Sequence, residues 1–253
     1  MKSAVPSRYL IGIDLGTTNS VVAYSDTEEV GPAGSPIRVF PVQQLVAPGE
    51  VRKLPALPSF IYFPTEHELS ADGISATWAD DPPMVTGVLA REQGALAPSR
   101  QVSSAKSWLS NPGAHRRARI LPAHAEPPQP MISPVEASAR YLMHLRDAWN
   151  AALATEANAR LEQQEIVLTV PGSFDEEARE LTVDAARSAG LENLTLLEEP
   201  LAAFYSWIAV NQQSQAGSCK LRDGELILIC DIGGGTTDFS LVRGSPGKGR
   251  VGV

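Results

Sequence analysis

The sequence predicts an α/β protein, and three observations support this fold class. A short apolar segment at residues 9–14 is followed by a Gly/Thr turn and a second β-rich segment, which is typical of a β-hairpin. From residue 133 onward, helix-like and strand-like segments alternate. A second hairpin pattern, again with a Gly/Thr turn, lies at residues 225–243. Alternation of this kind predicts a sheet with helices packed on its faces.

The region from residue 41 to residue 134 is rich in proline. Each proline removes a backbone hydrogen-bond donor and restricts the residue before it, so only short regular elements are expected there. We expect a strand at residues 58–63 and a helix at 103–109, after a strand at 37–40. We interpret this region as an inserted subdomain of irregular α+β structure.

The second half of the chain predicts longer elements. Ser133, Pro134 and Glu136 have the spacing of a helix N-terminus, with Ser133 as cap and Glu136 three residues later. This helix is expected to run to about residue 159. The other expected elements are a strand at 165–170, a helix at 174–189 capped by Ser173 and ended by Gly190, a strand at 195–197, a helix at 200–212, a polar link at 216–224, strands at 225–231 and 238–243, and a loose tail.

Composition excludes several classes of protein. The chain has 253 residues, 43% of them hydrophobic and 20% charged, with a net charge of −8. An acidic chain is a poor candidate for nonspecific binding to nucleic acid or anionic lipid. No apolar segment is long enough to span a membrane, and we recognise no signal peptide. The two cysteines, Cys219 and Cys230, exclude a disulfide framework and favour the cytoplasm.

Two turns with the same chemistry are the most informative feature. Asp14 ends a strand and precedes Gly16, Thr17, Thr18 and Asn19. Likewise, Asp231 ends a strand and precedes the turn residues Gly233, Gly234, Gly235 and Thr236 and then Asp238. Glycines allow backbone N–H groups to approach a phosphate closely, and threonine hydroxyls add donors. A carboxylate beside phosphate makes sense if a Mg²⁺ ion lies between them, held through water.

Simpler interpretations of these turns remain open at this point. A single Asp-x-Gly-Thr-Thr turn could merely connect two strands, although two such copies argue against that. Other phosphate-binding patterns are missing, because Gly247-Lys248 lacks the following Ser or Thr of a P-loop. The basic segment at residues 115–119 has no interleaved aromatic residues, so we interpret it as a solvated loop. The four histidines lack metal-ligand spacing.

Four segments in order resemble the seventy-kilodalton heat-shock chaperone (DnaK-type) family. They are IGIDLGTTNSVVAY, VLTVPGSFDEEARELTVDAARSAGL, LLEEPLAAFYSW and LILICDIGGGTTDFSLV, and together they span most of the chain. The resemblance implies an actin-like ATPase (ribonuclease H-like) lobe, with a mixed sheet flanked by helices. It implies residues 1–40 and 133–215 as the core of the first lobe, 41–132 as the inserted subdomain, and 216–253 as the link and first hairpin of a second lobe.

The resemblance also implies roles for individual residues. Asp14 and Asp231 match the acids that hold Mg²⁺ through water, and both turns match phosphate-binding segments, with ATP or ADP as ligand. Thr237 stands where many members have Phe. Lys106 matches the lysine that orients the attacking water, and Glu199 matches a glutamate near that water and the ion. Without the resemblance, Lys106 reads as a solvated helix residue and Glu199 as an acid that complements a helix dipole.

A second implied device is an interdomain switch formed by Pro171 and Arg179. Considered without the resemblance, Pro171 would simply end a strand, and Arg179 would pair with Asp175 or Glu176 on its own helix. The resemblance further implies peptide clients, a J-domain co-chaperone and a nucleotide exchange factor as partners of a longer parent protein, in a stress response. We expect that the second lobe is truncated after its first hairpin and that residues 1–253 alone hydrolyse ATP negligibly.

The expected hairpin at residues 225–243 lacks neighbouring strands, and an isolated hairpin is marginal in water. We therefore expect it to pack on the first lobe, to pair with another molecule, or to be poorly ordered. Two other functions remain open. One is a sugar or metabolite kinase of the same fold, which would transfer phosphate to an acceptor. The other is a filament-forming or nucleotide-sensing scaffold that binds nucleotide without turnover.

Overall fold

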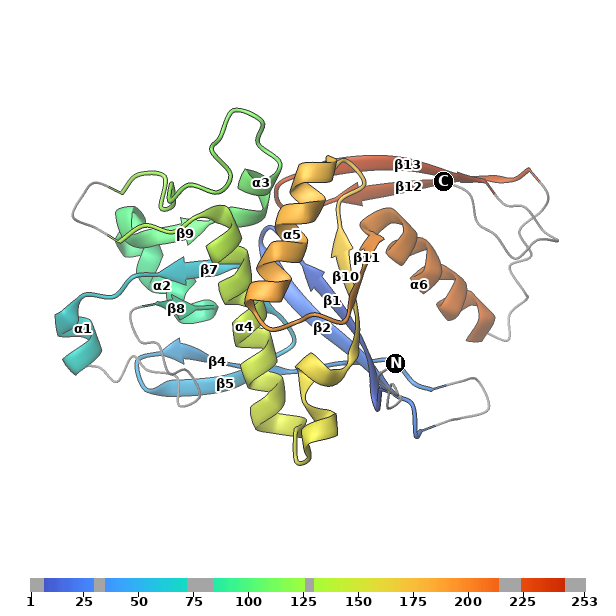
Figure 1. Cartoon of the computed structure of the whole chain (residues 1–253), viewed down its shortest axis with the longest axis horizontal. Helices are drawn as coiled ribbons and strands as arrows, with labels where there is room; N and C mark the ends of the chain where they lie inside the picture. Colours follow the sequence, from blue (N-terminus) through green and yellow to red (C-terminus); the bar gives the residue numbers. More distant parts are fainter. Residues whose placement is uncertain (1–6, 30–34, 72–83, 126–129, 214–223, 244–253) are drawn as a thin grey trace.

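The computed structural model describes residues 7–29, 35–71, 84–125, 130–213 and 224–243. Its centre is a six-stranded mixed sheet with the order β11-β10-β1-β2-β3, in which β6 also pairs with β2 (Figure 1). These strands are β1 (Tyr9–Leu15), β2 (Asn19–Asp26), β3 (Arg38–Val39), β6 (Leu57–Pro58), β10 (Glu165–Val170) and β11 (Leu194–Glu198). The sheet confirms the predicted α/β class.

β1 has a parallel neighbour on one side and an antiparallel neighbour on the other. β1 pairs antiparallel with β2, as expected of a hairpin, and parallel with β10, with Ile13 opposite Leu168. β10 in turn pairs parallel with β11, with Val170 opposite Glu198. Parallel strands end at the same edge of a sheet, so the segments that follow β10 and β11 lie near the turn that follows β1.

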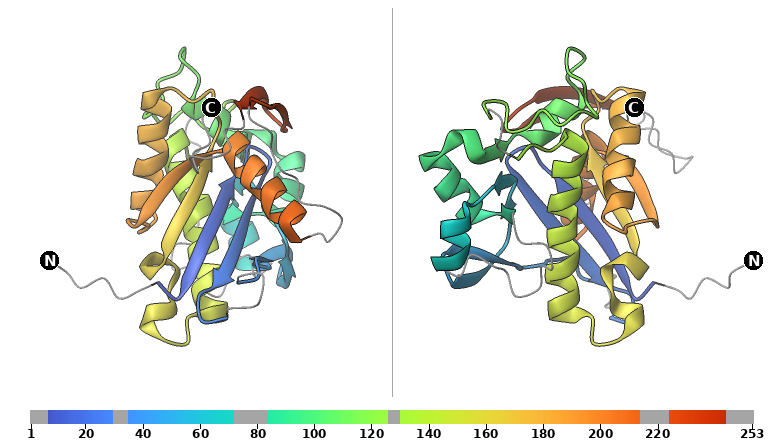
Figure 2. Two further views of the ribbon diagram at one scale, coloured as in Figure 1. Left: turned by 90° about the vertical axis from the view of Figure 1, so that its right-hand side faces the viewer. Right: turned by 60° about the vertical axis from the view of Figure 1, so that its left-hand side comes forward.

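Helices cover both faces of the sheet. α4 (Pro134–Leu153) and α5 (Glu176–Ser188) lie side by side on one face, and α6 (Glu199–Gln213) lies on the other (Figures 1 and 2). The main core forms between the sheet and α4. At its centre Trp149, which is fully buried, has its ring 5.1–5.3 Å from the rings of Tyr9, Tyr24 and Phe40. A core of this size stabilises the strand that carries Asp14.

The predicted N-terminus of α4 is confirmed, but the predicted C-terminus is wrong. The Ser133 hydroxyl accepts a hydrogen bond from the Glu136 N–H, and the Glu136 carboxylate accepts one from the Ser133 N–H. The helix ends at Leu153 instead of near residue 159. Beyond it the chain folds back, and the Trp149 Nε1–H donates to the carbonyl of Ala159, which is fully buried. This tertiary packing of Ala159 and Leu161 overrides local helix propensity.

The proline-rich region contains short elements beside α4. They comprise a hairpin of β4 (Val42–Ala47) and β5 (Glu50–Leu54), a three-stranded sheet of β7 (Phe60–Tyr62), β8 (Val85–Thr86) and β9 (Gln101–Ser103), and the helices α1 (Glu66–Ala71), α2 (Val88–Leu96) and α3 (Ala105–Leu109). The main core continues into this region, because Leu57, Ile61 and Val102 are part of it.

Two predicted boundaries in this region are wrong. The expected strand at 58–63 is divided at Ser59, since Leu57–Pro58 pairs with β2 whereas Phe60–Tyr62 pairs with β8 and β9. The expected helix at 103–109 begins later, because Ser103 belongs to β9. Ser104 lies between them with a φ of 54°, a left-handed conformation that separates the strand from the helix.

The elements after β10 follow the predicted order, but the N-cap of α5 is Asp175 and not Ser173. α5 begins at Glu176 and is capped by Asp175, whose carboxylate accepts from the Ala178 N–H at 2.7 Å. Ser173, which we expected to be the cap, precedes this position because a turn joins Phe174 to Pro171. Gly190 has a φ of +81° just after α5, as expected of a glycine that follows a helix.

The second hairpin consists of β12 (Leu226–Ile232) and β13 (Thr237–Arg243) and forms a sheet of its own. β12 contacts α6, so the hairpin packs on the rest of the molecule, which is the first of the three outcomes we expected. It lies along the top of Figure 1. The expected link at residues 216–223 and the tail at 244–253 lie outside the described residues. No described helix is both long and apolar enough to cross a membrane.

Candidate functional site

The first turn is held in place by a buried serine. The Ser59 hydroxyl donates to the Gly16 carbonyl at 2.8 Å, and the Ser59 N–H donates to the Thr18 carbonyl at 2.9 Å. The turn is too tight for a side chain at Gly16, because a Cβ there would lie 2.2 Å from the Asn19 carbonyl oxygen. Thr18 and Asn19 are exposed and Thr17 is half-buried. The turn therefore offers hydroxyl and backbone groups toward one edge of the sheet.

The second turn lies directly against the first. A Cβ on Gly234 would be 1.9 Å from the Thr18 Oγ1, and one on Gly235 would be 2.8 Å from the Thr17 Cγ2. The Gly233 N–H donates to the Thr236 carbonyl at 2.9 Å and closes this turn. A side chain at either glycine would therefore force the facing threonine to move, so the two turns approach closely because both positions are glycine. Two segments more than 200 residues apart in sequence form one surface.

Four ionisable groups gather beside these turns. Lys106 from α3 forms an ion pair with Glu199, the first residue of α6, and both side chains are largely buried. Burial raises the pKa of the Glu199 carboxyl, the negative charges of Asp14 and Asp231 raise it further, and Lys106 opposes them. Glu199 is therefore influenced by charged groups from three other segments of the chain, which carry Lys106, Asp14 and Asp231.

The donor set fits a magnesium ion held through water. Asp231 lies directly opposite Asp238 in the β12–β13 register, and like charges in that position repel each other. With Asp14 and Glu199 nearby, the acids outnumber Lys106, the base of this group. Among the described residues, no group of three or more His, Cys, Asp or Glu side chains could hold a metal ion directly. Carboxylates that bind through water molecules need no such tight cluster.

Pro171 and Arg179 lie on the side of this site next to β11. Pro171 is buried at the end of β10. Arg179 donates to the Phe174 carbonyl and forms an ion pair with Glu198 at 2.8 Å. The alternative interpretation, in which Arg179 simply pairs with Asp175 or Glu176 on its own helix, is therefore wrong. Since Glu198 immediately precedes Glu199, two basic residues from different helices pair with two consecutive acids.

Sequence reasoning missed three residues of the site. The Thr169 Oγ1 donates to the Asp14 Oδ1 at 2.9 Å and orients that carboxylate. Thr169 follows Leu168, which pairs with Ile13, so the parallel register of β1 and β10 would have predicted this contact. Ser59 carries no comparable signal. Ser107, whose Oγ lies 3.0 Å from a Cβ placed on Gly235, adjoins Lys106 in sequence.

The basic segment at residues 115–119 is exposed, as expected of a solvated loop, except at Arg116. Arg116 is almost fully buried and its guanidinium binds both carboxylate oxygens of Asp175 at 2.9 Å. Arg117 and Arg119 pair with Asp184 and Glu136. The prediction of a solvated loop is therefore wrong for Arg116 alone, since the other four residues of the segment are exposed.

A family model and individual relatives both match this chain, and they point to the same family. Residues 118–252 match the family model described as "Hsp70 protein". The chain is 34% identical to "Chaperone protein HscA" of Yersinia enterocolitica over 256 residues, which is 96% of this chain and 34% of that protein. It is 33% identical to "Chaperone protein HscA" of Serratia proteamaculans over 263 residues, 98% of this chain and 35% of that protein. The chain thus spans about a third of the length of these relatives.

Proposed function

Because the chain belongs to the Hsp70 family, we propose that residues 1–253 are the ATP-binding N-terminal part of a chaperone ATPase. One observation carries this proposal. Two turns with the same Asp-Gly-Thr chemistry, far apart in sequence, are in contact, and the aspartates that precede them act electrostatically on Glu199 of the Lys106–Glu199 ion pair. Connecting turns have no reason to meet in this way, whereas a phosphate chain needs donors from two sides.

The proposed ligand is ATP or ADP with Mg²⁺. Backbone N–H groups of the two turns and the hydroxyls of Thr17, Thr18 and Thr236 would donate to the phosphates. Asp14, oriented by Thr169, and Asp231 would hold the ion through water. The ion would supply positive charge against the phosphates and the transition state.

Lys106 and Glu199 have complementary parts in the proposed hydrolysis. Lys106 orients the attacking water, and Glu199 fixes the position of the ammonium group through their ion pair. Burial raises the pKa of Glu199, so its carboxylate is a better proton acceptor than an exposed one. Catalysis of this kind depends on positioning and electrostatics, since phosphoryl transfer asks little covalent chemistry of the protein.

Nucleotide binding in this proposal requires movement of the second hairpin. Gly234 and Gly235 contact Thr18 and Thr17, so phosphates can enter between the turns only if the turns separate. The hairpin can shift because it shares no strand pairing with the main sheet. Such a shift would also act on Glu199 and, through the adjacent Glu198, on Arg179.

This arrangement suggests how the site is coupled to the rest of a longer protein. We place Pro171 and Arg179 in the route from the phosphate site to a peptide-binding domain. Peptide clients, a J-domain co-chaperone and a nucleotide exchange factor are the partners proposed for that protein. The cytoplasm is the proposed compartment, since two cysteines give no disulfide framework.

The test is single-turnover ATP hydrolysis by a protein that extends this chain to the length of its relatives. Lys106→Ala should lower the rate by about 100-fold or more, the range seen when one electrostatic group of an active site is lost. Arg117→Ala is the matched control, because Arg117 is a basic residue on the surface that pairs with Asp184. Unchanged hydrolysis by Lys106→Ala would remove Lys106 from the site.

A further inference from the structure

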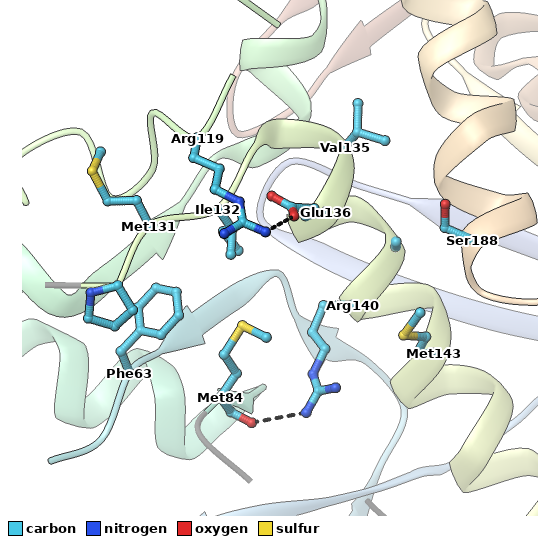
Figure 3. Close-up of a pocket in the computed structure, with 12 residues that line it drawn as sticks. Phe63, Met84, Arg119, Met131, Ile132, Val135, Glu136, Arg140, Met143 and Ser188 are labelled. Carbon is cyan, nitrogen blue, oxygen red and sulfur yellow. Dashed lines mark hydrogen bonds and ion pairs between the residues drawn. The ribbon is translucent and has the colours of Figure 1, made fainter. Parts of the chain in front are cut away.

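Ser107, a residue to which the proposed function gives no role, lies at the junction of the two turns. The residues in contact there lie within the described ranges. A cavity of about 420 Å³ at the start of α4 differs in this respect (Figure 3). Two residues that line it, Met84 and Pro130, adjoin segments 72–83 and 126–129, which lie outside the described residues. The turn junction is therefore the better defined of the two places.

The Ser107 hydroxyl lies where the two turns meet. A Cβ placed on Gly235 would lie 3.0 Å from the Ser107 Oγ and 3.2 Å from the Thr17 Oγ1. Thr17 belongs to the first turn, Gly235 to the second turn and Ser107 to α3, so three distant segments bring two hydroxyls beside one glycine. Hydroxyl donors beside a glycine backbone are suited to bind phosphate.

α3 attaches this serine to the core of the molecule. Ala105 and Leu109 on the same helix are buried, and α3 packs against α4. The Ser107 N–H donates to the Ser104 carbonyl at 3.0 Å, and the Ser107 carbonyl accepts from the Ser110 hydroxyl at 3.3 Å. The Ser107 hydroxyl itself has no hydrogen-bond partner among the described residues. The hydroxyl is therefore held in position and is available to a ligand.

The residue before Ser107 indicates which part of a nucleotide this hydroxyl reaches. Lys106 precedes Ser107, and consecutive Cα atoms are about 3.8 Å apart. Under the proposed function, Lys106 orients the water that attacks the terminal phosphate of ATP. Ser107 then stands beside the same phosphate group, which ADP lacks.

We propose that the Ser107 hydroxyl donates a hydrogen bond to the terminal phosphate of ATP, so that the site binds ATP in preference to ADP. This inference rests on the proposed function and adds a binding residue to it. Movement of the second hairpin withdraws Gly235 from Ser107 and Thr17, and a phosphate oxygen takes its place beside the two hydroxyls. Hydrogen bonds to an ionised acceptor are stronger than those between neutral groups, so one hydroxyl is enough to change the preference.

The test compares triphosphate and diphosphate binding in a protein that extends this chain to the length of its relatives. The probes are the Mg²⁺ complexes of ADP and of ATPγS, a slowly hydrolysed ATP analogue, titrated by calorimetry. Ser107→Ala should weaken ATPγS binding about tenfold, because it removes one hydrogen bond to a charged group. It should change the affinity for ADP by less than about twofold, because ADP has no phosphate at this position.

Two further variants separate the hydroxyl from the packing around it. Ser110→Ala is the matched control, since it removes a serine hydroxyl at the end of α3 that bonds to the Ser107 carbonyl. It should bind both nucleotides as the original protein does. Ser107→Cys keeps a side chain of similar shape but offers only a weak donor, so it should lose affinity for ATPγS as Ser107→Ala does. Thermal unfolding verifies that each variant is folded.

The outcomes distinguish this inference from the proposed function. If folded Ser107→Ala or Ser107→Cys binds ATPγS with the original affinity, the hydroxyl does not contact the phosphate and the inference is overturned, while the proposed function stands. Equal losses of ATPγS and ADP affinity in Ser107→Ala would show that Ser107 only supports the structure of the site. Failure of the original protein to bind either nucleotide would overturn the proposed function and this inference with it.

Discussion

The β1–β2 and β12–β13 hairpins share a sequence pattern, but they differ in how much strand pairing and side-chain burial holds them to the rest of the molecule. β1 is hydrogen-bonded on both edges, to β2 and β10, and its apolar residues Ile11, Ile13 and Leu15 are buried. β12 pairs with β13 alone among the described residues, and Leu226, Leu228 and Ile232 on it are exposed. Phe239 and Leu241 on β13 are exposed as well. The same turn chemistry is therefore presented once from a rigid sheet and once from a lightly attached ribbon.

This difference has a functional consequence under the proposed function. A site for phosphates between two turns needs one fixed side, which sets the geometry, and one side that can move to admit the ligand. The first turn is fixed by Ser59 and by the core around Trp149. The second turn is attached by contact with Thr17 and Thr18 and through α6. The two hairpins thus divide these two requirements between them.

The largest expected effect is on the free energy of unfolding, when one aliphatic residue from each hairpin is replaced by alanine. Ile13→Ala should lower the free energy of unfolding by about 2–5 kcal/mol, because it leaves a cavity in a well-packed core. Leu228→Ala should change it by less than about 0.5 kcal/mol, because that side chain is 58% exposed. Urea unfolding monitored by tryptophan fluorescence measures both. Similar losses in the two variants would show that the hairpins are equally supported.

A second prediction concerns pH and the support of the first hairpin. His144 on α4 is half-buried between β4 and β8, where its Nε2–H donates to the Gln43 carbonyl at 2.9 Å and its Nδ1 accepts from Thr86. The pKa of His144 is lowered from 6.5 to about 4, chiefly by burial and in smaller part by the charge of Arg140, while the hydrogen bond to the Gln43 carbonyl opposes both. His144 in the unfolded chain therefore takes up a proton at a higher pH than in the folded chain.

Because the unfolded chain takes up this proton at a higher pH, folding stability decreases as the pH falls. The contribution of His144 to stability is fully present above pH 6.5 and is lost as the pH falls toward 4, by about 3 kcal/mol in total. His144→Gln should lack this part of the pH dependence, which urea unfolding from pH 7 to pH 4.5 would measure. Parallel curves for the two proteins would show that the imidazole is not buried in a neutral form.

A smaller effect is expected from the serine that fixes the first turn. Ser59→Ala removes the donor to the Gly16 carbonyl and the partner of the Ser20 hydroxyl at 3.0 Å, both in the protein interior. The unfolding free energy should fall by about 1–3 kcal/mol, the cost of buried polar groups left without partners. Thr236→Ala, in the exposed second turn, is the control and should change it far less. Equal effects would contradict the unequal support of the two turns.

Local sequence signals predicted some of these features and missed others for physical reasons. The two turns and the Ser133–Glu136 cap follow from short-range chemistry, so the sequence was sufficient to predict them. The end of α4 at Leu153 depends on the burial of Ala159 and Leu161, which is a tertiary effect. The partners of Arg116, Arg179 and Asp14 come from segments distant in sequence, and their positions follow from sheet register and helix packing.

The central claim is that the two turns form one site, and a double-mutant cycle on Mg·ATP affinity tests it most directly. Asp14→Asn, Asp231→Asn and the double variant would be measured in a protein extended to the length of its relatives. If both carboxylates hold one ion, each single variant should weaken binding about tenfold or more, and the double variant should bind nearly as well as either single variant. Losses that multiply in the double variant would contradict a shared site.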